Sequence, residues 1–185
     1  MKPIKTAPTA PNVPTALSAL QDTFKDVMAC VATPVSIVTA LAHNGAPCGA
    51  TVSAFSSLSV SPPMVLISLD RRSRTLEVIR ESGRFGLNVL GADQGDLAMS
   101  FASKGGADKF RGTSWSIEHG LPRVSRASAW IASTVADFAD GGDHVIVLGR
   151  VDAAEAAAGR APLVYHRRRF GTHQPYHDPA RGVPA

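Results

Sequence analysis

Small hydroxyl side chains are concentrated in the first part of the stretch from Gly49 to Asp70. They are Thr51, Ser53, Ser56, Ser57, Ser59 and Ser61. Each hydroxyl offers a hydrogen-bond donor and an acceptor with little bulk, which suits an anionic ligand or one rich in hydroxyls. Pro62 and Pro63 come next, and we expect this turn at a strand end or sheet edge because proline cannot donate to a sheet. The stretch therefore predicts either a ligand-binding segment or a serine-rich loop between two strands.

A basic segment, Asp70–Thr75, comes directly after the hydroxyl-rich stretch and contains three arginines. It leads into Leu76–Arg80, where apolar spacing predicts a helix that Gly83 ends. Ser73 is a candidate N-cap for this helix. The free amides and the dipole of a helix start favour an anion there. We interpret the segment as a candidate phosphate site, and the alternative is a solvated basic turn with an ordinary cap.

The rest of the chain predicts mostly strands with a few helices around them. Apolar spacing indicates helices over residues 17–31, 76–83 and 93–103. His43-Asn44-Gly45 has the composition of a hairpin turn. Strands are expected over residues 35–39, 49–52, 64–69, 84–90, 115–118, 130–138, 145–151 and 162–166. Short connections argue against alternating βαβ units and favour an α+β fold, mainly β, with a closed or partly closed antiparallel barrel and helices outside it.

Length and composition bound the remaining possibilities. We expect one domain over residues 17–171, after a proline-rich, disordered lead-in over 1–16 and before a loose tail over 172–185. Two cysteines are too few for a metal knuckle or a disulfide framework, and a cytoplasmic protein is the default. No apolar run approaches the roughly 18 residues of a membrane helix. A net charge of +4 favours small anionic ligands, and 6% aromatic residues disfavour nucleic acid as a partner.

With these segments in order, the chain resembles the short flavin reductase family, whose fold is the FMN-binding split barrel. The resemblance covers about residues 24–171 and is specific through its combination of segments. The matching segments are residues 34–39, 49–59 with Pro62-Pro63, 72–75, 84–90, Lys109-Phe110, Gly142-Asp143-His144 and 162–165.

The resemblance implies an enzyme that transfers hydride from NADH or NADPH to FMN or FAD, often for a partner monooxygenase, and that forms a homodimer. It assigns His144, with Tyr165 and an arginine of the 167–169 run, to the nicotinamide side. It assigns Ser73, Arg74 and Thr75 to the flavin phosphate, with Lys104 or Lys109 nearby. The full set of cofactor-binding residues that it implies is Pro34, Val35, Thr51, Val52, Ser53, Ala54, Phe55, Ser56, Ser73, Arg74, Thr75, Lys104, Lys109, Phe110, Tyr165 and Arg167.

Other interpretations remain beside this one. A flavin-binding electron carrier or an oxidase that retains its flavin would have the same fold. Taken alone, His144 is also compatible with a hairpin residue that makes a local hydrogen bond, and the arginines at 167–169 with a solvated sheet edge. The hydride reaction itself requires no protein nucleophile, because positioning the two rings is the main task of the protein. That agrees with a chain in which no catalytic triad or metal-ligand spacing is found.

Overall fold

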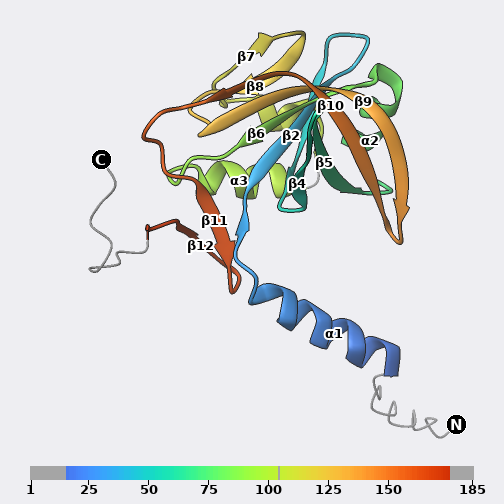
Figure 1. Cartoon of the computed structure of the whole chain (residues 1–185), viewed down its shortest axis with the longest axis vertical. Helices are drawn as coiled ribbons and strands as arrows, with labels where there is room; N and C mark the ends of the chain where they lie inside the picture. Colours follow the sequence, from blue (N-terminus) through green and yellow to red (C-terminus); the bar gives the residue numbers. More distant parts are fainter. Residues whose placement is uncertain (1–15, 104, 176–185) are drawn as a thin grey trace, which may run out of the picture.

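The structure is a computed structural model that describes residues 16–103 and 105–175. Its main element is a seven-stranded antiparallel sheet with the order β3-β2-β6-β9-β10-β5-β4. The sheet curls into a barrel (Figure 1). The barrel is split where the end strand β3 lies close to β5. The α+β class and the antiparallel split barrel predicted from the sequence are confirmed.

The elements have the following bounds. The strands are β1 (Thr33–Pro34), β2 (Ser36–Leu41), β3 (Pro47–Val52), β4 (Phe55–Val60), β5 (Pro63–Asp70), β6 (Arg84–Val89), β7 (Trp115–Glu118), β8 (Leu121–Val124), β9 (Ala129–Gly141), β10 (His144–Ala156), β11 (Leu163–His166) and β12 (Arg169–Thr172). The helices are α1 (Ala16–Ala29), α2 (Arg74–Ser82) and α3 (Gly95–Ala102), with a 3₁₀ turn η1 (Ala107–Phe110).

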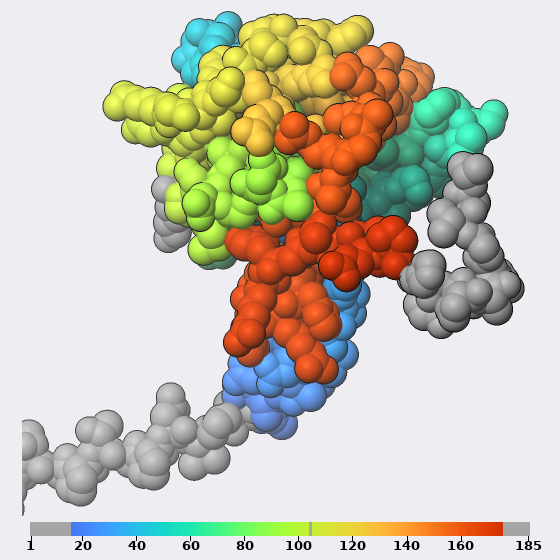
Figure 2. All heavy atoms as spheres, turned by 90° about the vertical axis from the view of Figure 1, so that its left-hand side faces the viewer, coloured from blue at the N-terminus to red at the C-terminus, as the bar shows by residue number. Residues whose placement is uncertain are grey.

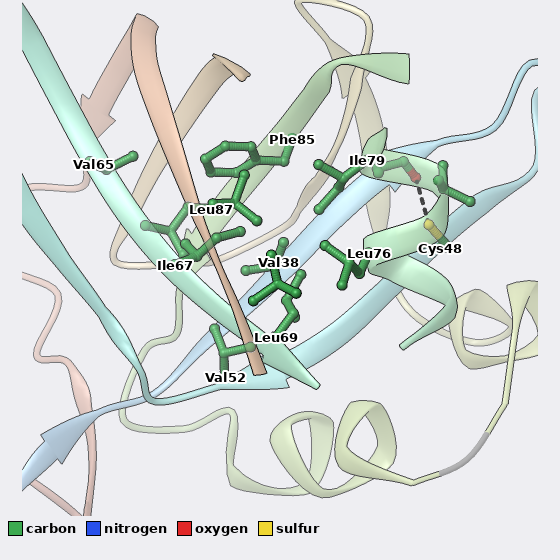
Figure 3. Close-up of a cluster of buried hydrophobic side chains, with 14 residues drawn as sticks. Val38, Cys48, Val52, Val65, Ile67, Leu69, Leu76, Ile79, Phe85 and Leu87 are labelled. Carbon is green, nitrogen blue, oxygen red and sulfur yellow. Dashed lines mark hydrogen bonds between the residues drawn. The ribbon is translucent and has the colours of Figure 1, made fainter. Parts of the chain in front are cut away.

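The interior of the barrel is filled by apolar side chains from alternate strand positions and from one face of α2. On β5 the buried residues alternate with more exposed ones, as a strand with one buried face requires. Ile67 of β5, Val38 of β2 and Leu76 of α2 are fully buried and point toward one another (Figure 3). Burial of each such side chain is worth about 1.5–3 kcal/mol. Helix α2 is therefore part of the core and not a surface addition.

Both faces of strand β2 are buried, one against the barrel interior and one against a second apolar cluster that lies outside the barrel. Ile37 points away from the barrel interior and packs with Phe101 of α3. Thr39, also fully buried, donates through Oγ1 to the carbonyl of Pro122 in β8 (2.6 Å). Asn88 of β6 donates to the carbonyl of Ile37 (3.1 Å). These contacts fix α3 and the β7–β8 hairpin on the outer face of the sheet.

Helix α1 and the β11–β12 hairpin extend from the barrel together (Figures 1 and 2). The amide of Arg167 donates to the carbonyl of Ala29 (2.7 Å), and Arg168 forms an ion pair with Asp26 (2.7 Å). None of the residues of α1 is buried. Its apolar side chains remain exposed, and they are Leu17, Leu20, Phe24, Val27 and Met28. No helix of the described ranges is long and apolar enough to span a membrane.

The β9–β10 hairpin is longer than predicted. The turn expected over residues 139–142 lies at Gly142 and Asp143, because β9 continues to Gly141 and β10 begins at His144. β10 also runs on to Ala156, through a segment to which the sequence had assigned no element. The strand was predicted only to Phe138, because β9 is exposed from Ala136 onward and apolar alternation gives no sign that it continues to Gly141.

The C-terminal part of the described chain also differs from expectation. Arg167 and Arg168 form a tight turn with positive φ angles of 47° and 61°. The chain then pairs back along β11 as β12, which reaches Thr172 at the border of the expected tail. The exposed strand β12 has no buried face whose pattern would reveal it in the sequence.

A glycine in β10 tests the packing of the barrel interior. A Cβ atom at Gly149 would lie 2.4 Å from Cζ of Phe85. Gly149→Ala should therefore lower the free energy of unfolding by about 1–3 kcal/mol, the usual cost of overpacking a core. Chemical denaturation measures this loss. In the double variant with Phe85→Leu the clash is relieved, so its loss should be smaller than the sum of the two single losses. If the losses of unfolding free energy in the two single variants simply add in the double variant, Gly149 and Phe85 are not in close contact.

Candidate functional site

Two adjoining hollows form one groove along the split of the barrel. The first, of about 510 Å³, lies between the start of α2, strand β3 and the segment that connects α3 to η1. The second, of about 260 Å³, lies at the gap between β3 and β5. Residues that line both hollows are Ala50, Thr51, Asp70 and Ser73. A ligand in this groove would contact the helix start at one end and the barrel split at the other.

The start of α2 is a candidate anion site at the first end of the groove. Ser73 occupies the N-cap position with an extended backbone, but its hydroxyl makes no capping hydrogen bond. The carbonyl of Ser73 accepts from the amide of Glu77 (3.2 Å) and so begins the helix. The amides of Arg74 and Thr75 precede the first intrahelical donor, and such amides have no partner within a helix. The hydroxyl of Ser73 and these amides are thus available to an anion.

Arg74 is the free cation beside this helix start. Its neighbour Arg72 is paired with Asp70, whose carboxylate accepts from Nη2 (3.0 Å) and from the backbone amide of Arg72 (2.8 Å). The hydrogen bonds from Arg72 lower the pKa of Asp70 to about 2, so this carboxylate is ionised. The Arg74 guanidinium makes no hydrogen bond or ion pair with the residues that the structure describes, and it lines the groove. It remains available for a charged ligand.

Lys109 forms part of the opposite wall of the anion site. Its ammonium donates to the carbonyl of Phe101 (2.9 Å) and lies 3.4 Å from the carbonyl of Gly49. Burial lowers the pKa of Lys109 below its usual value. The lysine therefore joins α3 and β3 at the groove wall, and it places a positive charge across from α2.

The other end of the groove is lined by small side chains and backbone. Strand β3 leads through Ser53 and Ala54 into β4, and the carbonyl of Ala54 accepts from the amide of Ser68 in β5 (2.9 Å). Thr51 donates through Oγ1 to the carbonyl of Ala98 (2.7 Å), which fixes its orientation. Small side chains and nearby peptide groups leave room for a flat ring and can donate hydrogen bonds to its edge. This end suits a polar aromatic system.

His144 lines the same end of the groove from β10. In the ladder between β5 and β10 it lies opposite Asp70. Its Nδ1 is 2.8 Å from Oδ1 of Asp143, and the hydrogen bond lowers the pKa of that carboxyl below its usual range. An ionised Asp143 favours a proton on Nδ1 and leaves Nε2 as the free ring nitrogen. The imidazole, 44% exposed, is therefore oriented and accessible.

The groove brings together about half of the residues implied by the resemblance. Those that line it are Thr51, Val52, Ser53, Ala54, Ser73, Arg74, Thr75, Lys109 and His144. Phe55 and Ser56 lie next to it on the edge strand β4, where Ser56 is exposed and Phe55 packs against the core. Lys104 is outside the described residues.

Five further residues lie elsewhere. Val35 and Phe110 are 2% and 5% exposed and belong to the outer apolar cluster. Pro34 pairs with the β11–β12 hairpin, which also holds Tyr165 and Arg167. Arg167 borders a separate hollow of about 670 Å³. We assign the site to the groove and not to this separate hollow, because the groove holds the start of α2, Arg74 and His144.

Several residues that line the groove were not predicted as site residues from the sequence. Asp70 and Ser68 come from the end of β5, and Phe101, Ser103 and Gly105 come from the end of α3 and the segment after it. The position of Asp70 directly before the arginines was the one signal for its role. Phe101 has the pattern of a core residue, and its contact with the groove follows from the packing of α3 on β3.

Comparison with known proteins agrees with this geometry. Residues 28–174 match the model of the flavin reductase-like domain. The chain is 43% identical over 153 residues to the reductase component of 4-nitrophenol 4-monooxygenase/4-nitrocatechol 2-monooxygenase of Rhodococcus opacus, across 83% of this chain and 81% of that one.

Solved structures show the same likeness. Nitrilotriacetate monooxygenase component B of Mycobacterium thermoresistibile superposes with a TM-score of 0.81 at 34% identity, over 92% of this chain and 93% of that one. An NADH:FAD oxidoreductase of Streptomyces globisporus, in complex with NAD and FAD fragments, has a TM-score of 0.80 at 28% identity, over 90% and 99% of the two chains. From its barrel, its groove and these matches, the chain belongs to the flavin reductase-like family.

Proposed function

We propose that this protein is an NAD(P)H-dependent flavin reductase whose flavin lies along the groove, with its phosphate at the start of α2 and its ring at the split between β3 and β5. The observation that carries the proposal is the continuity of the two hollows, which share Thr51 and Ser73. This continuity places the start of α2 in line with a ring-sized gap, together with Arg74, which has no ion-pair partner among the described residues. Either FMN or FAD contains the phosphate and the ring that these two ends suit.

The residues of the chain bind and orient, and the bound cofactors supply the redox chemistry, since hydride passes from one ring to the other. Ser73, the first amides of α2 and Arg74 would hold the phosphate. Ser53, Ala54 and Thr51 would border the ring and its polyhydroxyl chain. His144, oriented by Asp143, would position the nicotinamide, which can give a large rate advantage without a protein acid or base.

The partner class follows from the relatives. Proteins at 43% and 34% identity are named as the reductase component and component B of monooxygenases, and the S. globisporus structure is named as an NADH:FAD oxidoreductase. We infer that this protein likewise uses a reduced nicotinamide and supplies reduced flavin to a monooxygenase. A cytoplasmic location is part of the proposal, since reduced nicotinamide is made there.

We further infer a homodimer, with α1 as part of the interface. The apolar residues of α1 repeat at helical spacing, yet no residue of this helix is buried in the chain. A helix with an apolar stripe requires a partner surface. Tyr165 and Phe170 add a pair of aromatic rings on the neighbouring hairpin, with centroids 5.3 Å apart and planes inclined by 58°. A second copy would cover this surface with the same residues by symmetry.

The phosphate site is tested with Arg74→Ala. Loss of a charge-assisted hydrogen bond should weaken FMN binding by about 1.5–3 kcal/mol, or about 10- to 150-fold, and should leave riboflavin binding nearly unchanged. Fluorescence titration with both flavins measures the difference. Arg80→Ala, at the last turn of the same helix, is the matched control and should bind both flavins normally. Equal losses of affinity for the two flavins in Arg74→Ala would remove the phosphate from this end of the groove.

The nicotinamide side is tested with His144→Ala. We expect a higher KM for reduced nicotinamide and a lower rate of flavin reduction, together about 10- to 100-fold, because the imidazole orients the ring. Flavin affinity should hardly change. Stopped-flow reduction of the flavin-loaded variant measures the rate, and His43→Ala, in the exposed β2–β3 turn, is the control. A normal rate at limiting nicotinamide would leave His144 as a hairpin residue.

The dimer is tested with Phe24→Asp on the apolar face of α1. A buried, unpaired carboxylate opposes association, so the variant should be monomeric at concentrations where the wild-type protein is a dimer. Sedimentation or light scattering determines the molecular mass. Asp22→Ala, which changes a charge paired with Lys25 on the same helix, is the control and should remain dimeric. A dimeric Phe24→Asp variant would place the interface on another surface.

A further inference from the structure

Arg71 connects the end of β5 to the β9–β10 turn from which His144 begins. Its amide donates to the carbonyl of Asp143 (3.0 Å). Its Nε donates to the carbonyl of Gly142 (2.7 Å), and its Nη2 donates to Oδ1 of Asp140 (2.8 Å). One residue therefore contacts three of the residues in and beside the turn. Unlike Arg72 and Arg74, it does not line the groove.

We propose that Arg71 is a positioning residue for the reduction: by holding the β9–β10 turn in place, it allows Asp143 to orient the imidazole of His144 toward the groove. The proposal rests on the nicotinamide role given to His144 above. It adds a residue that touches neither ligand and acts through the turn.

The need for such a contact follows from the lack of packing around the turn. The last six residues of β9, from Ala136 to Gly141, are exposed, and the side chain of Asp143 is 91% exposed. Gly142 has a φ angle of 72°, in the left-handed region that glycine adopts more readily than other residues. None of the residues from Ala136 to Asp143 belongs to the buried apolar clusters, which begin on β10 only at Val145. Polar contacts must therefore determine the conformation of the turn.

The arginine side chain suits this task through its geometry. Its planar guanidinium can donate from two nitrogens at fixed angles, here to a backbone carbonyl and to a carboxylate. The ion pair with Asp140 is exposed on both sides, 41% and 86%, and contributes little by itself. The bond to the carbonyl of Gly142 is the stronger constraint, because it is charge-assisted and acts on the backbone of the turn.

The contact reaches His144 by a short path. Gly142 is followed by Asp143, whose carboxylate is bonded to Nδ1 of His144. A shift of the turn would move this carboxylate while Val145, which is buried, keeps the β10 backbone in place. The ring of His144 would then lose its orienting partner without losing its position in the strand. The expected consequence is poorer placement of the nicotinamide and not loss of the fold.

The proposal is tested with a double-mutant cycle of Arg71→Ala and His144→Ala in the full-length protein. Arg71→Ala alone should raise the KM for NADH and slow flavin reduction, by about 3- to 10-fold together. Its FMN affinity and melting temperature should match those of the wild-type protein. In the His144→Ala background, Arg71→Ala should cause no further change, because its effect passes through His144. Arg150→Ala, at the other end of the β5–β10 ladder, is the arginine control.

Three results would overturn the proposal. The first is wild-type kinetics in Arg71→Ala, and the second is a kinetic defect of the double variant that equals the sum of the two single defects. The third is a loss of FMN affinity in Arg71→Ala as large as its kinetic defect. If Arg71→Ala lowers the melting temperature, Arg71→Gln is measured in its place. The KM for NADH then tests the proposal, because a smaller folded fraction lowers the rate of flavin reduction but does not change the affinity of the folded molecules for NADH. A defective His144→Ala beside a normal Arg71→Ala would refute the positioning role alone. A normal His144→Ala would instead refute the role of His144, and a wild-type protein that reduces no flavin would refute the proposed function.

Discussion

The packing of α2 into the barrel is the contact on which the rest of the site depends. Leu76, Val78 and Ile79 are buried against the interior of the barrel, and the helix contacts β2, β3 and β6. With these side chains in the core, the N-terminus of α2 lies at the groove, which Ser73 and Arg74 line. The same burial that stabilises the fold thus delivers free amides and Arg74 to the groove. Gly83, with a φ angle of 69°, then ends the helix and returns the chain to β6.

Three arginines close in sequence have different electrostatic tasks because strand pairing gives them different neighbours. Arg72 is paired with Asp70 and neutralises it, whereas Arg71 is bound to the β9–β10 turn. Arg74 has no such partner among the described residues and faces the groove. The carboxylate of Asp70 would by itself repel an anionic ligand in the groove. Its ion pair with Arg72 offsets most of that electrostatic repulsion. The site is therefore cationic through Arg74 and Lys109, even though Asp70 lines it.

Outside the groove, helix α1 and the β11–β12 hairpin form an exposed apolar surface. The barrel interior and the outer cluster leave α1 uncovered, and the hairpin bound to its C-terminal end carries Tyr165 and Phe170. Two of the residues that the resemblance assigned to the nicotinamide side, Tyr165 and Arg167, lie on this hairpin and not at the groove of the same chain. A homodimer of the kind proposed above would bury this surface.

Much of the fold could be predicted because local patterns determine local elements. Asn44-Gly45 forms the expected hairpin between β2 and β3, and the apolar spacing of Leu76–Arg80 forms the expected helix. The continuation of β9 beyond Phe138 and of β10 beyond Val151, and the strand β12, were not predicted, because a strand without a buried face has no alternating pattern. These strands exist through hydrogen bonds to a neighbouring strand, which no local window of the sequence contains.

The candidate site shows the same division. The sequence by itself determined that hydroxyls, a helix start and arginines lie close together along the chain, and this was enough to indicate an anionic ligand. Only the tertiary structure decided which of them share a groove: Thr51 and Ser53 line it, whereas Ser56 points to solvent from an edge strand. It also decided that His144 lies opposite Asp70, far from it in sequence. The physical reason is that side-chain identity is local, while the neighbours of a side chain are chosen by strand register and by burial of the core.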